Sequence, residues 1–461
     1  MTHRSAPRAF TRRNMLQSAS AGFGAMALSA MCKEASAAQV NPLAPKLPHF
    51  PAKAKRVIFL FMRGGPSQME TFSYKPKLNA DHGKPVKDKS KIKYFGSQWK
   101  FKQYGESGHW VSDLFRQTAQ HVDELCQLHA MHTDHTNHPQ AMDQLHTGSF
   151  QFERPSMGSW VLYGLGSENK NVPGFICVKP PVQWGGARYY GSSFLPSVYQ
   201  GTPIGTMTKS VKLAKVSNVL HPHLTQSAQR QQLDYLRLVN ERTRERTDAD
   251  SVIEGLIESH ELAFRMQSDL PELINLSNES QETLDLYGIG DGKRSDDFGR
   301  QCLMARRFAE SGVRFIELTH DNWDHHSGVA KNMPLRCEQT DQPIAGLLAD
   351  LRRRGLLDET LVVWGGEFGR TPDDPTSDGR GHNAKGFTMW LAGGGVKRAH
   401  IHGKTDDYGY QGVEGRVHMH DLHATILHLM GLDHRRLTYR YGGRDFRLTD
   451  VHGQVVHEVI A

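Results

Sequence analysis

The sequence is poor in the features that mark several large classes of protein. It has five cysteines in 461 residues and no C-x-x-C pair, so a cysteine-based zinc site has no support and buried free thiols are the expected state. Its formal charge of +7 is modest for this length, and aromatic residues do not interleave with basic ones. We therefore expect no nucleic-acid partner. No apolar run is long enough to predict a stable membrane span.

Two common catalytic signatures are also missing. There is no G-x-S-x-G sequence, which disfavours a serine triad of the α/β-hydrolase kind. The glycine-rich stretches "RGGPS" and "GGGVK" match neither a phosphate-binding loop nor a dinucleotide fingerprint. We interpret both as tight turns that follow strands.

The first 38 residues have the pattern of an export signal. The paired Arg12 and Arg13 precede a small-residue apolar run that ends near an "ASA" cleavage site at residues 35–37. This pattern resembles a twin-arginine signal, which directs folded proteins, often with their cofactor in place, to the twin-arginine export machinery. We therefore predict a periplasmic or extracellular protein without a membrane span after cleavage. Residues 39–54 are predicted to be a proline-rich linker.

Short apolar stretches alternate with helical patterns along the rest of the chain. The expected strands are "RVIFLFM", "LCQLHAMHT", "VRFIEL", "LVVWGG" and "FTMWLAGG", and residues from about 222 to 310 show the apolar spacing of helices. This order predicts an α/β fold with a mostly parallel central sheet and helices on both faces. We expect a single domain over residues 55–461, with a helical insertion at about 222–310.

Carboxylate and imidazole side chains gather near the ends of these expected strands, where α/β sheets carry their sites. The candidates are Glu70, Asp324, His325, His326, Glu367, His382 and His420. Taken singly, each histidine is better explained as a surface or core residue. Together they favour a divalent metal, with zinc first and calcium, manganese or magnesium as alternatives. In "DNWDHHSG" we favour Asp324 and His326 as ligands, with His325 as the rival to His326.

Several longer motifs carry a resemblance to a known family. "FLFMRGGPSQMETF", "NHPQAMDQLHTGSF", "LLDETLVVWGGEFGRTP" and "VHMHDLHATILHLMGLDHRRLTYRYGGRDFRLTDVHG" resemble the bacterial family called domain of unknown function 1501. That family is similar in turn to the alkaline phosphatase and sulfatase superfamily. There, metal ions held by Asp and His at strand ends activate a nucleophile that attacks a phosphate or sulfate ester.

The resemblance also implies roles for single residues. Glu367 takes the place of a metal-binding Asp, and Phe368 the place of a His, so His382 would have to supply the missing imidazole. Glu70 stands near the position of the Asp that follows the first strand. Asn137 or His138 occupies the nucleophile position, where Ser, Thr or Cys is expected, and neither has a hydroxyl or thiol.

These observations predict an exported, metal-dependent hydrolase of phosphate or sulfate esters, acting on an anionic small molecule or glycan ester. His138 is expected to be a general base for an attacking water, and Arg63, Arg370 or Arg380 to hold the anionic oxygens. For Arg370, an ion pair at the protein surface is an equal alternative. The alternative function is a non-catalytic binding protein that retains the hydrolase fold.

Overall fold

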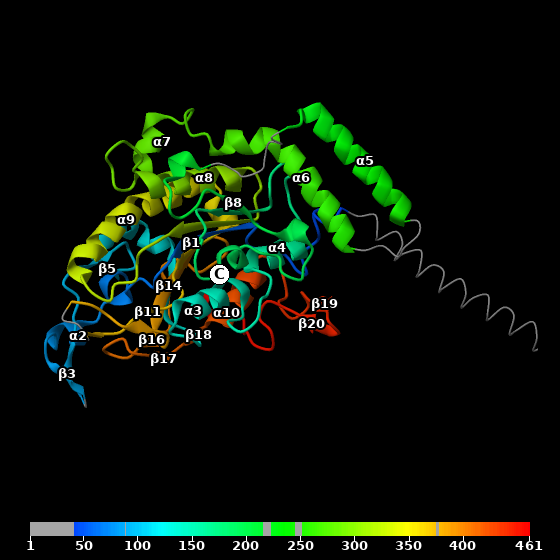
Figure 1. Cartoon of the computed structure of the whole chain (residues 1–461). Helices are drawn as coiled ribbons and strands as arrows, with labels where there is room; N and C mark the ends of the chain where they lie inside the picture. Colours follow the sequence, from blue (N-terminus) through cyan, green and yellow to red (C-terminus); the bar gives the residue numbers. More distant parts are fainter. Residues whose placement is uncertain (1–40, 88, 215–222, 245–250, 375–377) are drawn as a thin grey trace, which may run out of the picture.

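The computed structural model describes residues 41–87, 89–214, 223–244, 251–374 and 378–461 (Figure 1). The expected export signal lies outside these residues. Among the described residues, every helix is too short or too polar for a membrane crossing. Cys126, Cys177, Cys302 and Cys337 are buried and unpaired, as expected.

A large mixed sheet forms the centre of the described structure. Its strands follow the order β15-β6-β14-β10-β1-β9-β7-β8, and β18 pairs with β6. The strands are β1 (Arg56–Met62), β6 (Leu125–His132), β7 (Phe175–Val178), β8 (Thr202–Ile204), β9 (Phe315–His320), β10 (Thr360–Gly365), β14 (Phe387–Ala392), β15 (His400–His402) and β18 (Val417–His418). Only the two pairings of β14, with β10 and with β6, are antiparallel among these described strands. The predicted mostly parallel sheet is therefore confirmed.

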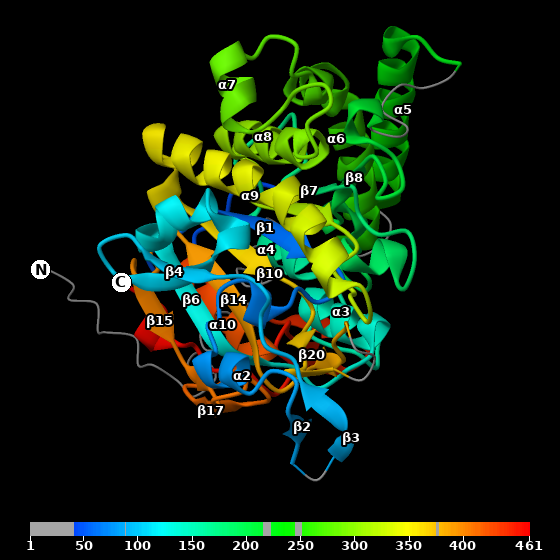
Figure 2. The ribbon, with the colours of Figure 1, turned by 90° about the vertical axis from the view of Figure 1, so that its left-hand side faces the viewer.

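The central strand β1 is buried on both faces because it lies between two layers of helices. Ile58, Leu60 and Met62 belong to the core beneath α8 (Asp296–Glu310) and α9 (Val329–Arg353). The alternate residues Val57, Phe59 and Phe61 belong to the opposite core, beneath α3 (His138–Thr147), α4 (Met157–Leu165) and α10 (Met419–Leu429). Figure 2 shows the sheet between these layers. This two-residue alternation in a continuous apolar run is typical of a strand covered by helices on both sides.

The remaining elements lie outside the central sheet. The segment predicted to be helical holds α5 (Gln226–Arg244), α6 (Ser251–Ile274) and α7 (Gln281–Leu286) before α8, and α5 and α6 stand to one side of the sheet (Figure 1). The division into linker, domain and insertion stays a prediction. The smaller elements are α2 (Pro76–Ala80), β2 (Pro85–Val86), β3 (Lys89–Tyr94), β4 (Phe101–Tyr104), β5 (His109–Ser112), β11 (Gly369–Arg370), β12 (Asp373–Asp374), β13 (His382–Asn383), β16 (Lys404–Thr405), β17 (Gly412–Glu414), β19 (Tyr439–Tyr441) and β20 (Arg444–Phe446).

The strand directions bring distant parts of the sequence to one edge of the sheet. β1, β9 and β10 are parallel, so the residues that follow their carboxyl ends are neighbours. β14 runs the opposite way, so His382, which precedes it, lies at the same edge. β6 is antiparallel to β14 and therefore also delivers its carboxyl end, which leads into α3 at His138, to this edge.

Candidate metal site

Four side chains from three segments of the chain meet at this edge. They are His138 at the start of α3, Asp324 and His326 in the loop after β9, and His382 in β13, and one ligand atom of each lies within 4.8 Å of the others. Nε2 of His138, His326 and His382 lies 3.2, 3.1 and 3.3 Å from a carboxylate oxygen of Asp324. Ligand atoms that bind zinc tetrahedrally at about 2.0–2.1 Å lie roughly 3.3 Å apart. These three spacings fit a shared cation, whereas Nε2 of His326 and Nε2 of His382 lie 2.7 Å apart, a hydrogen-bond distance that would lengthen when both bind a cation.

His138 is held in the tautomer that a metal ligand or general base requires. Its Nδ1 lies 2.6 Å from Glu367 Oε1, and because a carboxylate only accepts, Nδ1 carries the hydrogen. In the neutral imidazole Nε2 is therefore without a hydrogen. It is buried and faces the Asp324 carboxylate at 3.2 Å. Burial lowers the pKa of His138, but the carboxylates of Asp324 and Glu367 outweigh it and raise that pKa to about 8.

His382 is also oriented by an acceptor behind its ring. Its Nδ1 lies 2.5 Å from the carbonyl oxygen of Thr136 and must donate to it, which leaves Nε2 as an acceptor. That atom faces His326 Nε2 at 2.7 Å. Metal-binding histidines commonly donate their other ring N–H to a carbonyl or carboxylate in this way. The donor set thus fits a divalent cation.

Arg370 fixes the position of Asp324. Its side chain is 1% exposed, and Nη2 donates to Asp324 Oδ1 at 2.5 Å. Nε donates to the Gly65 carbonyl at 2.9 Å and Nη1 to the Arg380 carbonyl at 3.3 Å. Burial disfavours the Asp324 carboxylate, but contacts with its histidine neighbours and Arg370 outweigh it and hold the pKa of Asp324 well below its usual range.

Glu367 reaches the site through His138. It is fully buried and accepts hydrogen bonds from His138 Nδ1 and from the backbone N–H of Gly64 at 3.0 and 3.2 Å. Gly64 has a φ of +112°, and a Cβ there would lie 2.6 Å from the backbone nitrogen of Asp324. The loops after β1 and β9 can therefore approach this closely only with glycine at this position.

Three other candidates from the sequence are not in the four-residue group. Glu70 is buried and accepts from Arg380 Nε at 3.0 Å and Nη2 at 2.5 Å. His325 is buried, and its desolvation, with Arg370 nearby, lowers its pKa to about 4. His420 Nε2 lies 2.8 Å from the Gly148 carbonyl oxygen. The structure therefore brings together Asp324, His326, His382 and His138, with Glu367 behind them.

Trp184 is a site residue that the sequence did not reveal. Its ring stacks on His138 with centroids 5.7 Å apart and an interplanar angle of 12°. The Arg63 guanidinium lies over the same ring at 4.3 Å. Trp184 is 46% exposed, so it forms part of the wall between His138 and solvent. An aromatic residue beside two glycines, in "QWGG", was the only signal.

Residues 54–460 match the family model described as "Protein of unknown function (DUF1501)". The chain belongs to the DUF1501 family. The membership implied by the motifs is thereby confirmed for this DUF1501 protein. No curated protein matches its sequence.

Several solved structures resemble this DUF1501 protein in fold. The lipoteichoic acid synthase LtaP from Listeria monocytogenes is 7% identical, over 88% of this chain and 79% of that one, with a TM-score of 0.36. A sulfatase from Pseudoalteromonas sp. is 12% identical over 82% and 68%, with a TM-score of 0.37. Alkaline phosphatase from the Antarctic bacterium TAB5 is 11% identical over 74% and 92%, with a TM-score of 0.31. Likenesses at these scores carry no argument about activity, so function is argued from the site.

Proposed function

We propose that this protein is an exported, metal-dependent hydrolase of phosphate or sulfate esters, with an anionic small molecule or glycan ester as substrate. The observation that carries the proposal is the convergence of His138, Asp324, His326 and His382 at the carboxyl edge of the sheet. Two of these imidazoles, those of His138 and His382, keep a hydrogen on Nδ1 because an acceptor lies behind them, and their Nε2 atoms point toward Asp324. The similarity of the motifs to the phosphatase and sulfatase superfamily supports the reaction class.

Asp324, His326 and His382 would hold the cation. A set of two imidazoles and one carboxylate favours zinc over calcium or magnesium, which prefer oxygen ligands, while manganese remains an alternative. Three protein ligands leave one position open, as catalytic zinc sites require. When bound, the cation supplies Lewis acidity that polarises the ester and lowers the pKa of water.

His138 acts as the general base. Glu367 keeps a hydrogen on Nδ1, so in the neutral imidazole, which predominates above a pH of about 8, Nε2 can accept the proton of a water that attacks the ester. This role suits a site in which Asn137 and His138 occupy the position of the superfamily's nucleophile. Direct attack by water needs no covalent intermediate on the protein.

Arg370 keeps Asp324 in place with four of its five N–H groups, which leaves one N–H of Nη1 for a substrate oxygen. Nε, Nη1 and Nη2 each donate to an acceptor of the protein. The conservative substitution Arg370→Lys would retain the charge but lose the planar fork that bridges these acceptors.

The test measures turnover of a panel of phosphate and sulfate monoesters by the metal-loaded protein and by Glu367→Gln. We expect turnover of at least one ester, reduced about 100-fold or more in the variant, with metal content unchanged. A metal-loaded protein that hydrolyses no ester would favour the alternative, a binding protein that retains the fold. This alternative is supported by the absence of a hydroxyl or thiol at Asn137 and His138.

A further inference from the structure

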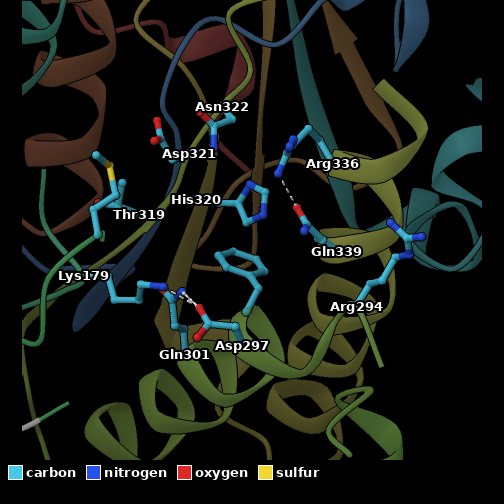
Figure 3. Close-up of a pocket in the computed structure, with 12 residues that line it drawn as sticks. Lys179, Arg294, Asp297, Gln301, Thr319, His320, Asp321, Asn322, Arg336 and Gln339 are labelled. Carbon is cyan, nitrogen blue, oxygen red and sulfur yellow. Dashed lines mark hydrogen bonds and ion pairs between the residues drawn. The ribbon is translucent and has the colours of Figure 1, made fainter. Parts of the chain in front are cut away.

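The loop that carries Asp324 also forms one wall of a second cavity. This cavity, which we call the basic pocket, has a volume of about 170 Å³ and lies beyond the carboxyl ends of β7 and β9 (Figure 3). The lining residues that matter here are Lys179, Gln301, Thr319, Asp321, Arg336 and Gln339. None of them belongs to the candidate metal site.

Arg336 projects from α9 into the basic pocket without a carboxylate partner among the described residues. Its Nη1 donates to Gln339 Oε1 at 2.9 Å, as Figure 3 shows. Its Nε is buried and has no hydrogen-bond partner among the described residues. An arginine charge that is partly desolvated and unpaired is costly, and an anionic ligand would remove that cost.

The other charges of the basic pocket are already compensated. Asp297 pairs with Lys179 at 2.6 Å, and Asp321 pairs with Arg63 at 2.5 Å. Arg294, at the exposed rim, lies 3.2 Å from Glu338. Asp321 also attracts Arg336 at longer range, so Arg336 is the charged lining residue that has no ion-pair contact among the described residues.

Two further polar atoms at the basic pocket lack a partner in the described structure. Thr319 is 2% exposed and Gln301 is 1% exposed, yet Thr319 Oγ1 and Gln301 Oε1 make no hydrogen bond. The hydroxyl can donate to an oxyanion, whereas the amide oxygen can only accept. Together with Arg336, these atoms match a ligand that carries both an oxyanion and a hydroxyl group.

The basic pocket and the candidate metal site share the loop after β9. Asp321 lines the pocket, and Asp324, three residues later, belongs to the metal group. Arg63 joins the two: its side chain pairs with Asp321, and its carbonyl oxygen accepts from the Trp323 N–H at 3.1 Å. The two sites therefore lie on one loop, three residues apart, and this proximity is the ground for assigning them to one ligand.

We propose that the basic pocket binds an oxyanion group, a sulfate, phosphate or carboxylate, of a hydroxyl-bearing ligand, with Arg336 as its anchor. This group is the second anionic group of a substrate whose reacting ester lies at the metal site, for example an anionic sugar. The assignment to a substrate rests on the proposed function, whereas the binding of an oxyanion group does not.

The direct test is calorimetric titration of inorganic sulfate into the metal-free protein, in which the Asp324 carboxylate already occupies Arg370 and the imidazoles of the four-residue group. We expect saturable binding that weakens about tenfold or more in Arg336→Gln and changes less than twofold in the rim control Arg294→Gln. Equal affinity in Arg336→Gln and its parent, or no saturable binding, would overturn the proposal.

Thr319→Val separates binding from folding. Because the Thr319 hydroxyl has no partner in the described structure, its removal should leave thermal stability unchanged or raise it, while sulfate binding weakens. Sulfate binding as tight as in the parent would contradict a role for this hydroxyl.

If Arg336→Gln does not fold, Arg336→Lys is used instead, and a loss of affinity is again expected.

A last comparison distinguishes a free anion from a group carried on the substrate. With an active enzyme, sugar esters that bear a second sulfate should show a lower KM than singly sulfated ones, and Arg336→Gln should abolish this difference. An unchanged KM difference would overturn the substrate assignment. Failure of ester hydrolysis would instead affect the proposed function and the substrate assignment that rests on it, but not the binding of an oxyanion, because sulfate titration needs no turnover.

Discussion

The imidazole of His138 and the carboxylate of Glu367 form a buried pair in which Nδ1 lies 2.6 Å from Oε1. The two residues are 229 positions apart in the sequence, and the pair exists because α3 and β10 reach the same edge of the sheet. It holds His138 Nε2 toward Asp324 at 3.2 Å. In the proposed function, this relationship separates the residues that would hold a cation from the residue that would move a proton.

His138→Ala should separate these two roles. We expect metal content to stay near that of the wild type and kcat to fall about 10²- to 10⁴-fold, the usual contribution of a general base. Metal analysis and steady-state kinetics on the same preparation measure both quantities. Loss of the metal together with activity would make His138 a ligand instead.

Gly64→Ala, in the turn after β1, should displace the loop that carries Asp324. At a φ of +112° an added Cβ would lie 2.6 Å from the backbone nitrogen of Asp324, so the loop carrying Asp324 must shift. We expect a loss of about 1–3 kcal/mol in the free energy of unfolding and weaker metal binding. Gly442→Ala is the matched control, because Gly442 also has a positive φ, of +54°, but a Cβ there meets nothing within 4 Å. Equal metal affinity in the two variants would contradict this explanation.

The buried pair of His146 and Glu317 should make stability depend on pH. Their Nε2 and Oε1 atoms lie 3.1 Å apart, and both side chains are 2% exposed. Burial lowers the pKa of His146, but the Glu317 charge outweighs it and raises that pKa above its ordinary value of 6.5. The pair therefore contributes fully below about pH 6.5, and its contribution is lost as the pH rises through the raised pKa.

Denaturant unfolding of the wild type and His146→Gln at pH 6 and pH 9 measures this effect. The difference in the free energy of unfolding should be larger at pH 6. A difference that grows toward pH 9 would show that the sign of the linkage is wrong.

Export should depend on the paired arginines of the N-terminal segment. Replacing Arg12 and Arg13 together by lysine removes the twin-arginine pattern but keeps the charge. We expect the precursor to accumulate in the cytoplasm, as measured by cell fractionation and by the mass of the N-terminus. Normal processing of the doubly substituted chain would contradict the assigned route.

The fold was predictable because apolar runs report burial directly. "RVIFLFM" spans the same residues as β1, and its continuous apolar character follows from helices on both faces. The direction of β14 was not predictable, since an antiparallel strand within a parallel sheet has the same apolar run as its neighbours. The short β7 and β8 also lacked a distinctive pattern.

The site was predictable to the extent that its residues follow strand ends. Asp324 and His326 follow β9 directly, and His382 precedes β14, so the sheet edge alone brings them together. Which side chains pair could not be predicted from the sequence, because partners such as Glu70 and Arg380 are 310 positions apart. Glu70 and Glu367 each follow a strand and could not be distinguished in the sequence. In the structure, the carboxylate of Glu70 accepts from Arg380 and that of Glu367 from His138.

The most direct test of the central claim is elemental analysis of the purified, mature protein, expressed as metal per chain. We predict about one tightly held divalent cation, with zinc favoured, that is lost in Asp324→Asn and His326→Ala. The control His457→Ala, an exposed histidine that is not in the group, should retain it. A folded wild-type protein that contains no metal and takes up no added zinc, manganese or calcium would contradict the metal site and the hydrolase that depends on it.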